Sequence, residues 1–268
     1  MSNLLKCERT ELTITHRCNL RCKLCGAYSP YYSPTPHWTY DYLVKSIERY
    51  FEIVDYVGKL TLSGGEPLLH PQLAELLEFV SSYVDRIGVL EIITNGSVVP
   101  NEQTLLNLKA FNKVSVIVDN YGPNLSSKVD GIGSALTNYE IKHLVRKYYG
   151  EDTYYNGWID MSDLSKRNRT DVENEKIYKQ CIFSDKFQRF LIVDGKIYIC
   201  AVCRRCDSLD LINDPNDSID LFDDILSIEQ KKEQIKNFFN RKFFASCKYC
   251  NGFCDNYERF KPAEQMVE

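Results

Sequence analysis

The chain has 268 residues, of which 44% are hydrophobic and 26% are charged, an ordinary composition for a globular protein. Its formal net charge of −4 and pI of about 5.7 leave no electrostatic footprint for nucleic acid or an anionic membrane. The first ten residues lack the apolar stretch of a secretory signal, and no run approaches the roughly 18 apolar residues of a membrane span, so a cytoplasmic protein is predicted.

A strand–helix alternation fills the first two-thirds of the chain. Alternating or apolar runs predict strands at 11–15, 59–63, 90–94, 114–118 and 139–145, and helical spacing of apolar residues predicts helices from Thr39, from Pro71 and around 101–111. Repeated units of this kind imply parallel strands with right-handed crossovers. The predicted fold class is therefore α/β, as an open doubly wound sheet or as a full or partial barrel.

Residues able to bind ligands follow the ends of four predicted strands. In chain order they are the cysteines of CNLRCKLC (18–25), Gly64-Gly65-Glu66, Thr94-Asn95 and Asp119-Asn120. The carboxyl ends of parallel strands meet at one edge of a sheet or barrel, where ligands bind in such folds. We therefore expect these residues to lie on a common rim.

The pattern changes after about residue 150. Residues 154–176 are polar and aromatic and indicate a connector, and 187–200 predict a hairpin that turns at Asp194-Gly195. A stretch rich in Asp and Asn (207–224) and a mixed-charge helix (about 227–242) lead to the segment CKYCNGFCDNY. We expect three parts: a core at 1–150, a connector with the last core elements at 151–180, and a small cysteine-bearing module at 181–268.

The number and grouping of the cysteines predict metal or redox chemistry. There are eleven, and all but Cys7 fall in the segments 18–25, 181–206 and 247–254. Disulfides are not expected in a reducing compartment, so clustered thiols indicate metal ligands. Thiolates suit zinc or an iron–sulfur cluster, but a zinc site needs a fourth ligand, and His16 and His37 lack zinc-finger spacing. Three thiolates on a [4Fe-4S] cluster leave one iron open.

The CxxxCxxC motif of Cys18, Cys22 and Cys25, followed about forty residues later by LSGGEPLLHP, resembles the radical S-adenosylmethionine (SAM) enzymes. In that family the three cysteines bind a [4Fe-4S] cluster, and SAM chelates the open iron. The resemblance implies a partial (β/α)6 TIM-like barrel. It also implies a set of SAM contacts. These are Ser63, Gly64, Gly65, Glu66 and Pro67 at the methionine amino group, Thr94 and Asn95 at the ribose end, and Asp119 with Asn120 as weaker candidates there. The family commonly has an aromatic residue at the position of Leu24, and this departure from the pattern affects a stacking contact only.

The later cysteines resemble a second family pattern, the SPASM/twitch extension. Its opening is matched by Cys181, Gly195 and Cys200, with thirteen residues between the first two and four residues between the last two. The next two ligands are matched by Cys247 and Cys250. The resemblance implies one auxiliary [4Fe-4S] cluster on these four cysteines, because the chain ends the longer SPASM pattern early, at Cys254. The layout is similar to that of twitch dehydrogenases that oxidise a carbocyclic alcohol. A structural zinc knot on the same four cysteines is the alternative.

The family implies that reductive cleavage of SAM gives a 5′-deoxyadenosyl radical, which abstracts hydrogen from a substrate C–H bond, and that flavodoxin or ferredoxin supplies the electron. An electron passed to the auxiliary cluster gives oxidation, whereas a hydrogen atom returned by Cys203 or Cys206 gives epimerisation. The barrel begins by about residue 11, which leaves no room for a peptide-binding domain and favours a small sugar, cyclitol or nucleotide-linked sugar. Modification of a ribosomal peptide is the alternative, and a non-catalytic zinc-binding scaffold is the hypothesis from another class.

Polar side chains outside these motifs are expected to be structural. His16, His70 and His143 are interpreted as core or rim residues rather than ligands. Lys166, Arg167 and Arg169 are interpreted as a solvated basic face in preference to a phosphate site.

Overall fold

The structure is a computed structural model that describes residues 4–183 and 189–267. Its strands are β1 (Lys6–Thr15), β2 (Tyr56–Gly64), β3 (Ile87–Thr94), β4 (Val114–Asn120), β5 (His143–Lys147), β6 (Arg189–Val193), β7 (Lys196–Tyr198) and β8 (Ser218–Asp220). Its α-helices are α1 (Tyr40–Ile53), α2 (Leu73–Ser81), α3 (Glu102–Phe111), α4 (Val129–Asn138), α5 (Asp171–Gln180), α6 (Ala201–Ser208) and α7 (Ile228–Phe239). Short 3₁₀ turns are η1 (Ser29–Tyr31), η2 (Pro67–Leu69), η3 (Val84–Arg86), η4 (Tyr154–Asn156) and η6 (Ala245–Tyr249).

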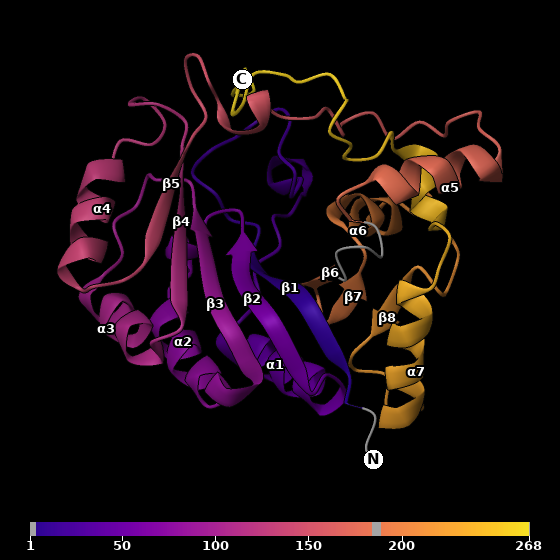
Figure 1. Cartoon of the computed structure of the whole chain (residues 1–268), viewed down its shortest axis with the longest axis horizontal. Helices are drawn as coiled ribbons and strands as arrows, with labels where there is room; N and C mark the ends of the chain where they lie inside the picture. Colours follow the sequence, from indigo (N-terminus) through magenta and orange to yellow (C-terminus); the bar gives the residue numbers. More distant parts are fainter. Residues whose placement is uncertain (1–3, 184–188, 268) are drawn as a thin grey trace.

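The described strands form one curved sheet in the order β5-β4-β3-β2-β1-β6-β7-β8. Strands β1 to β5 pair in parallel, β6 pairs in parallel with the free side of β1, and β7 and β8 are antiparallel. Helices α1 to α4 line the outer side of the parallel strands (Figure 1). This open, mainly parallel α/β sheet confirms the expected partial TIM-like barrel.

The two faces of β1 show how the sequence builds a barrel with a polar interior. Leu12 and Ile14 are buried in the apolar core of the protein. Arg9, Glu11 and Thr13 alternate with them and line a cavity on the opposite face. Side chains of a strand alternate between faces, so a charged residue at every second position places those charges inside the barrel.

Most predicted elements are confirmed, and their end signals explain why. The Thr39 side chain accepts a hydrogen bond from the Tyr42 N–H at the start of α1, as an N-cap does. The predicted hairpin is β6–β7, with Asp194 (φ 54°) and Gly195 (φ 67°) in the left-handed region that a two-residue hairpin turn requires. Residues 187 and 188, at the start of the predicted hairpin, lie outside the described residues.

Three sequence expectations about elements need correction. The first strand begins at Lys6 rather than residue 11, because its first residues include the exposed Lys6 and Glu8, which a hydrophobic pattern does not mark. The strand predicted at 139–145 is β5, which begins at His143, because α4 continues to Asn138 and Glu140 (φ 57°) turns the chain. The connector contains α5, whose start carries a capping box formed by Thr170 and Glu173.

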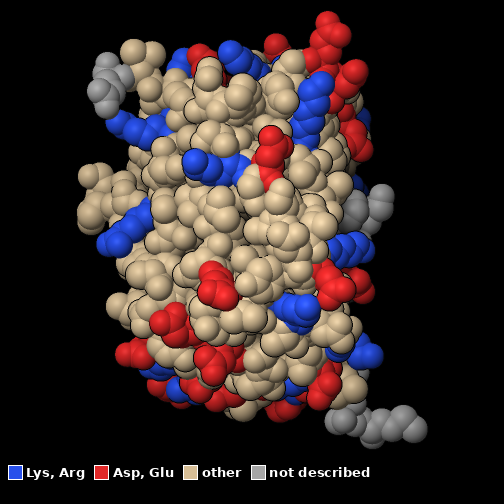
Figure 2. Space-filling model, turned by 90° about the vertical axis from the view of Figure 1, so that its left-hand side faces the viewer, with Lys and Arg blue, Asp and Glu red and all other residues tan. Residues whose placement is uncertain are grey.

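The described residues on the face of the molecule shown in Figure 2 form no patch of a single charge sign that would identify a macromolecular partner. On the face shown in Figure 2, acidic and basic side chains both occur, with broad areas that carry neither. In the part of the chain that the structure describes, no helix combines the length and the apolar character needed to cross a membrane.

Candidate functional site between two sets of cysteines

The loop after β1 carries Cys18, Cys22 and Cys25 at the carboxyl end of the sheet. Two protein N–H groups point at the sulfur of Cys18: the backbone N–H of Leu20 donates to Cys18 Sγ (3.4 Å), and Asn95 Nδ2 donates to the same atom (3.6 Å). Burial raises the pKa of the Cys18 thiol to about 11, and Glu66 and Cys25 add to this effect. A buried thiol of this kind ionises when it binds a cation, which is how metal binding and thiol deprotonation are linked.

The C-terminal segment of the chain packs against this same loop. Residue Gln265 forms an antiparallel β-bridge with Cys22, and its Nε2 donates to Cys22 Sγ at 3.3 Å. The Lys23 N–H donates to the Glu264 carbonyl (2.8 Å), and Lys23 Nζ pairs with the Glu264 carboxylate (2.5 Å). Residues more than 240 positions apart in sequence thus form one structural unit around the cysteine loop.

The glycines of the GGEP motif allow close packing of backbone on backbone. A Cβ on Gly64 would lie 2.0 Å from the Thr15 carbonyl oxygen, and a Cβ on Gly65 would lie 2.4 Å from that of Arg17. Gly65 N–H also donates to the Thr15 carbonyl (2.8 Å). The pair therefore fastens the end of β2 to the chain leading into Cys18. The Ser63 side chain contacts a neighbouring strand, since its Oγ donates to Glu11 Oε1 at 2.5 Å. It remains a prediction that SAM is contacted by Ser63, Gly64, Gly65 and Pro67.

Glu66 joins the ends of β2 and β3. Its side chain is fully buried, and its carboxylate accepts from the Leu68 N–H (3.0 Å), from Thr94 Oγ1 (2.9 Å) and from the Asn95 N–H (2.7 Å). Burial raises the pKa of Glu66 to about 7, against the lowering effect of these donors. Thr94 and Asn95 are thereby brought beside the cysteine loop, as the common rim predicts.

We expect Glu66→Gln to destabilise the fold although the two side chains have the same shape. Both carboxylate oxygens accept hydrogen bonds, so the amide NH₂ must face either the Asn95 N–H or the Thr94 and Leu68 donors. Leaving a buried donor unsatisfied costs about 1–3 kcal/mol. Thermal unfolding of the anaerobic protein measures the loss, and an unchanged midpoint would contradict this role for Glu66.

Asp119 lies on the same rim, but its carboxylate is engaged by a neighbouring strand. Arg146 Nε donates to Asp119 Oδ1 (2.5 Å) and Arg146 Nη2 to Oδ2 (2.7 Å), which is a bidentate pair between β4 and β5. Burial raises the pKa of Asp119, and the Arg146 guanidinium acts in the opposite direction. A contact of Asp119 with SAM remains a prediction, whereas its pairing with Arg146 was not foreseen.

The four predicted auxiliary ligands converge although they come from three separate segments. One small cavity of about 30 Å³ is lined by Cys181, Cys200, Cys247 and Cys250, together with apolar residues of α5 and α6. Burial raises the pKa of Cys247 to about 12, and the Cys250 and Cys181 thiols raise it further. This all-thiol donor set suits an iron–sulfur cluster. Among the described residues, no three Cys, His, Asp or Glu side chains stand close enough to hold a single metal ion.

Arg169 supports the Cys247–Cys250 segment. Its Nη2 donates to the Cys247 carbonyl (2.9 Å) and to the Cys250 carbonyl (2.5 Å). The expectation that Arg169 belongs to a solvated face is therefore wrong, because it binds the main chain of the second cysteine set.

Cys203 and Cys206 do not face a cavity that could hold substrate. Both side chains are fully buried on α6, and Cys203 Sγ donates to the Asp217 carbonyl at 3.3 Å. Neither residue belongs to the lining of the large cavity described below. Their proposed role as hydrogen-atom donors therefore gains no support from their positions. Cys254 is also buried, with its thiol directed at the Ile177 carbonyl (3.9 Å).

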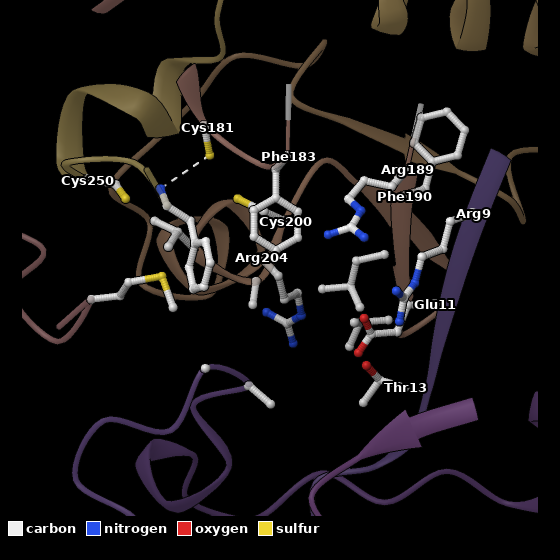
Figure 3. A pocket seen from close by; sticks show the side chains of 18 of the residues that line it. Arg9, Glu11, Thr13, Cys181, Phe183, Arg189, Phe190, Cys200, Arg204 and Cys250 are labelled. Carbon is white, nitrogen blue, oxygen red and sulfur yellow. Dashed lines mark hydrogen bonds between the residues drawn. The ribbon is translucent and has the colours of Figure 1, made fainter. Parts of the chain in front are cut away.

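A cavity of about 240 Å³ lies beside the second set of cysteines (Figure 3). Gly26 and Ala27, which directly follow Cys25, line one part of it, and Cys181, Cys200 and Cys250 line another. Apolar side chains make up most of the remaining wall: Met161, Phe183, Phe190, Leu191, Val193, Val202 and Phe253. The cavity thus borders both sites at which iron–sulfur chemistry is expected.

The polar residues of this cavity include several that sequence analysis did not single out. Arg9, Glu11 and Thr13 come from β1, Arg189 from β6 and Arg204 from α6. The alternating charges of RTELTIT were a usable signal, since charged residues at every second position of a strand mark a polar interior. Nothing in the sequence pointed to Gln265.

Comparison with known proteins identifies a family and a shared fold. The profile of the Radical SAM superfamily matches residues 12–156. A GTP 3′,8-cyclase of Microcystis aeruginosa is 27% identical over 123 residues, which is 45% of this chain and 37% of the relative. A GTP 3′,8-cyclase of Aquifex aeolicus is 30% identical over 127 residues, which is 44% of this chain and 37% of the relative. The chain thus matches well under half of the length of these relatives.

Two solved structures share the fold over nearly the whole chain. Native anSMEcpe with bound AdoMet superposes with a TM-score of 0.58 at 14% identity, covering 92% of this chain and 89% of the other. BtrN in complex with AdoMet and 2-DOIA gives a TM-score of 0.56 at 18% identity, covering 99% and 98%. With the profile match over more than half of its residues and the three-cysteine loop at the end of β1, this chain belongs to the radical SAM superfamily.

Proposed function

We propose that the chain is a radical SAM enzyme that oxidises a carbinol carbon of a small molecule to a carbonyl. The observation that supports this most is a cavity lined both by the two residues that directly follow Cys25 and by three cysteines of the second set. A substrate in that cavity lies next to Gly26 and Ala27 of the first cysteine loop and next to Cys181, Cys200 and Cys250 of the second. Oxidation requires both neighbours, because the substrate loses a hydrogen atom and then an electron.

Oxidation of a carbinol to a carbonyl removes a hydrogen atom, an electron and a proton from the substrate, and each of them needs an acceptor next to the cavity. When bound, SAM and its [4Fe-4S] cluster supply the radical that takes the hydrogen atom, and an auxiliary [4Fe-4S] cluster supplies an acceptor for the electron. The remaining species is the hydroxyl proton. The Glu11 carboxylate faces the cavity from β1 and is oriented by Ser63 Oγ. We assign Glu11 as the proton acceptor, so that a hydrogen atom, an electron and a proton together convert the carbinol to a carbonyl.

The positions of Cys203 and Cys206, which are not assigned to either cluster, favour oxidation over epimerisation. Epimerisation needs a hydrogen-atom donor beside the substrate, and Cys203 and Cys206 are buried outside the cavity lining. The thiols that do border the cavity, Cys181, Cys200 and Cys250, are those assigned to the auxiliary cluster.

The size of the cavity favours a sugar, a cyclitol or the sugar part of a nucleotide-linked sugar. At about 240 Å³ it is smaller than the roughly 300–1,000 Å³ of drug-sized sites. The cyclase activity in the names of the relatives belongs to proteins that this chain matches only over its N-terminal part, so we do not carry it over. Modification of a ribosomal peptide is the second candidate, since a side chain could enter a cavity of this size.

Three further assignments complete the proposal. We keep the division into a core at 1–150, a connector at 151–180 and an auxiliary module at 181–268, although β6 extends the core sheet beside β1. We assign Ser63, Gly64, Gly65, Glu66, Pro67, Thr94 and Asn95 to the surroundings of SAM, with Asp119 more distant through its pairing with Arg146. A flavodoxin or ferredoxin would supply the electron that begins each reaction cycle.

Mass spectrometry of products formed in D₂O tests oxidation directly. The reconstituted enzyme is incubated with SAM, reductant and a panel of sugars and cyclitols. Oxidation gives a product lighter by two hydrogen atoms, which a hydrazine traps as a carbonyl, with one 5′-deoxyadenosine formed for each product molecule. A product of unchanged formula that carries one solvent deuterium on carbon would instead show epimerisation and overturn the proposal.

The hydrogen bond from Gln265 Nε2 to Cys22 Sγ is expected to raise the reduction potential of the SAM-binding cluster. Hydrogen bonds to cluster sulfurs stabilise the additional negative charge of the reduced state. We therefore expect Gln265→Leu to shift the midpoint to a more negative value in an EPR-monitored redox titration. Glu264→Gln, which removes only the exposed ion pair with Lys23, is the matched control and should leave the midpoint unchanged. Equal midpoints in the wild type and Gln265→Leu would contradict the assignment.

A further inference from the structure

The charged residues of the large cavity are unequal in sign. Three arginines, Arg9, Arg189 and Arg204, face it against one carboxylate, Glu11, and Figure 3 shows all four side chains directed at the same space. A cavity with largely apolar walls strengthens electrostatic interactions, because little water is present to screen them. The excess of positive charge therefore bears on the charge of the ligand that the cavity binds.

Part of this charge is already balanced within the barrel. Arg9 Nη2 pairs with Glu91 Oε1 at 2.8 Å, and the same buried carboxylate receives Lys59 Nζ at 2.8 Å and Thr61 Oγ1 at 3.1 Å. Glu11 accepts from Ser63 Oγ. These interactions fix the β1 side of the cavity, where Arg189 of β6 lies in register with Arg9. The remaining arginine is Arg204, which comes from α6.

Arg204 extends from α6 into the cavity between aromatic rings. Its guanidinium lies 5.5 Å from the centroid of Tyr32 and 6.0 Å from that of Tyr198. Its Nε is buried and makes no hydrogen bond to any described residue. A guanidinium held over aromatic rings by cation–π contacts keeps its N–H donors available, and these donors match the two oxygens of a carboxylate or phosphate.

Two further residues that line the cavity favour an anion. His16 is buried, its Nδ1 contacts Ser29 Oγ at 3.2 Å, and its Nε2 has no hydrogen-bond partner among the described residues although it lines the cavity. Burial lowers the pKa of Arg189, and the neighbouring Arg9 lowers it further, so a bound anion near this guanidinium would stabilise its charge.

We propose that the cavity binds a small molecule carrying an acidic group, either a carboxylate or a phosphate ester, and that Arg204 with His16 binds that group while the carbinol faces Glu11. The inference deepens the proposed function and rests on it in one respect, because it takes this cavity as the substrate site. It narrows the substrate class from sugars and cyclitols to their acidic derivatives.

Calorimetric titration of the reconstituted enzyme, in the presence of SAM and without reductant, tests this without turnover. The probes are glucose, glucuronate and glucose 6-phosphate, which differ in the acidic group. We expect at least one acid to bind about tenfold more tightly than glucose or better, as expected for a charge-assisted bidentate contact. Preference for glucuronate or for glucose 6-phosphate identifies the acidic group as carboxylate or phosphate.

The neighbouring arginine provides a matched control. Arg205 lies on the same helix and over the same Tyr32 ring (4.8 Å), but it is not among the residues that line the cavity. We expect Arg204→Gln to lose the preference for acids, Arg204→Lys to retain part of it, and Arg205→Gln to retain it fully. The visible absorbance of each variant confirms that both clusters are assembled. Acids that bind no better than glucose, no binding of either acid, or an unchanged preference in Arg204→Gln would each overturn the inference.

Failure of this inference is distinguishable from failure of the proposed function. Formation of 5′-deoxyadenosine by the wild-type enzyme is measured in a separate assay. SAM cleavage without an Arg204-dependent preference for acids would overturn the acidic-substrate inference alone. An Arg204-dependent preference in a protein that cleaves no SAM would overturn the proposed enzymatic function, while the binding site would stand.

Discussion

Replacing Cys18, Cys22 and Cys25 together with alanine is expected to abolish reductive formation of 5′-deoxyadenosine. The three thiols lie in one loop, two of them accept N–H···S hydrogen bonds, and each is required to hold the cluster to which SAM binds. The auxiliary thiols come from other segments and line their own cavity. We therefore expect the variant to keep about half of its iron and the absorbance of the auxiliary cluster, as measured by iron analysis and visible spectroscopy.

Cys7→Ala is the control for this triple variant. Cys7 is a buried thiol at the start of β1 within the apolar core, away from the cysteine loop, so its loss should leave iron content and SAM cleavage unchanged. Loss of all visible absorbance from a triple variant that still folds would contradict the assignment of a separate auxiliary cluster to Cys181, Cys200, Cys247 and Cys250.

Arg146→Met is expected to destabilise the protein by about 3–5 kcal/mol, the typical cost of removing one partner of a buried ion pair. Both Asp119 oxygens accept from Arg146, and the Asp119 side chain is 9% exposed against 19% for Arg146. Without the guanidinium, Asp119 retains a buried charge or binds a proton. The midpoint of thermal unfolding, measured anaerobically against the wild type, reports the loss.

The pH dependence of this variant tests the cause. Burial already raises the pKa of Asp119, and removing Arg146 must raise it further. An acid whose folded-state pKa lies above its unfolded value loses stability as the pH rises through that interval. The deficit of Arg146→Met should therefore be larger at about pH 8 than at about pH 5. Asp119→Asn removes the negative charge and should destabilise the protein less than Arg146→Met does, because the Arg146 side chain reaches solvent. A loss of stability in Asp119→Asn that equals or exceeds that of Arg146→Met would contradict this account.

The parallel core was predictable because its signals are local. Apolar runs such as VSVIV, the N-cap at Thr39 and the Asp194-Gly195 turn each specify their own element. The rim was predictable for the same reason, because every motif on it follows a strand end. Strand β1 was predicted too short, because Lys6 to Arg9 carry polar residues toward the barrel interior or the surface, and a hydrophobic pattern does not mark such positions.

What the sequence did not predict depends on contacts between distant residues. Gln265 reaches Cys22, Arg169 binds the Cys247 and Cys250 carbonyls, and β6 pairs with β1. None of these contacts has a local signature, because each partner is an ordinary polar or apolar residue in its own segment. The same reason applies to Cys203 and Cys206, because only the packing of α6 shows that they are buried and outside the lining of the cavity.

Anaerobic purification followed by incubation with reductant and SAM tests the central claim most directly. The account predicts a brown protein with broad, reducible absorbance, iron and sulfide sufficient for two [4Fe-4S] clusters, and release of 5′-deoxyadenosine. A colourless protein that contains stoichiometric zinc and forms no 5′-deoxyadenosine under these conditions would contradict it.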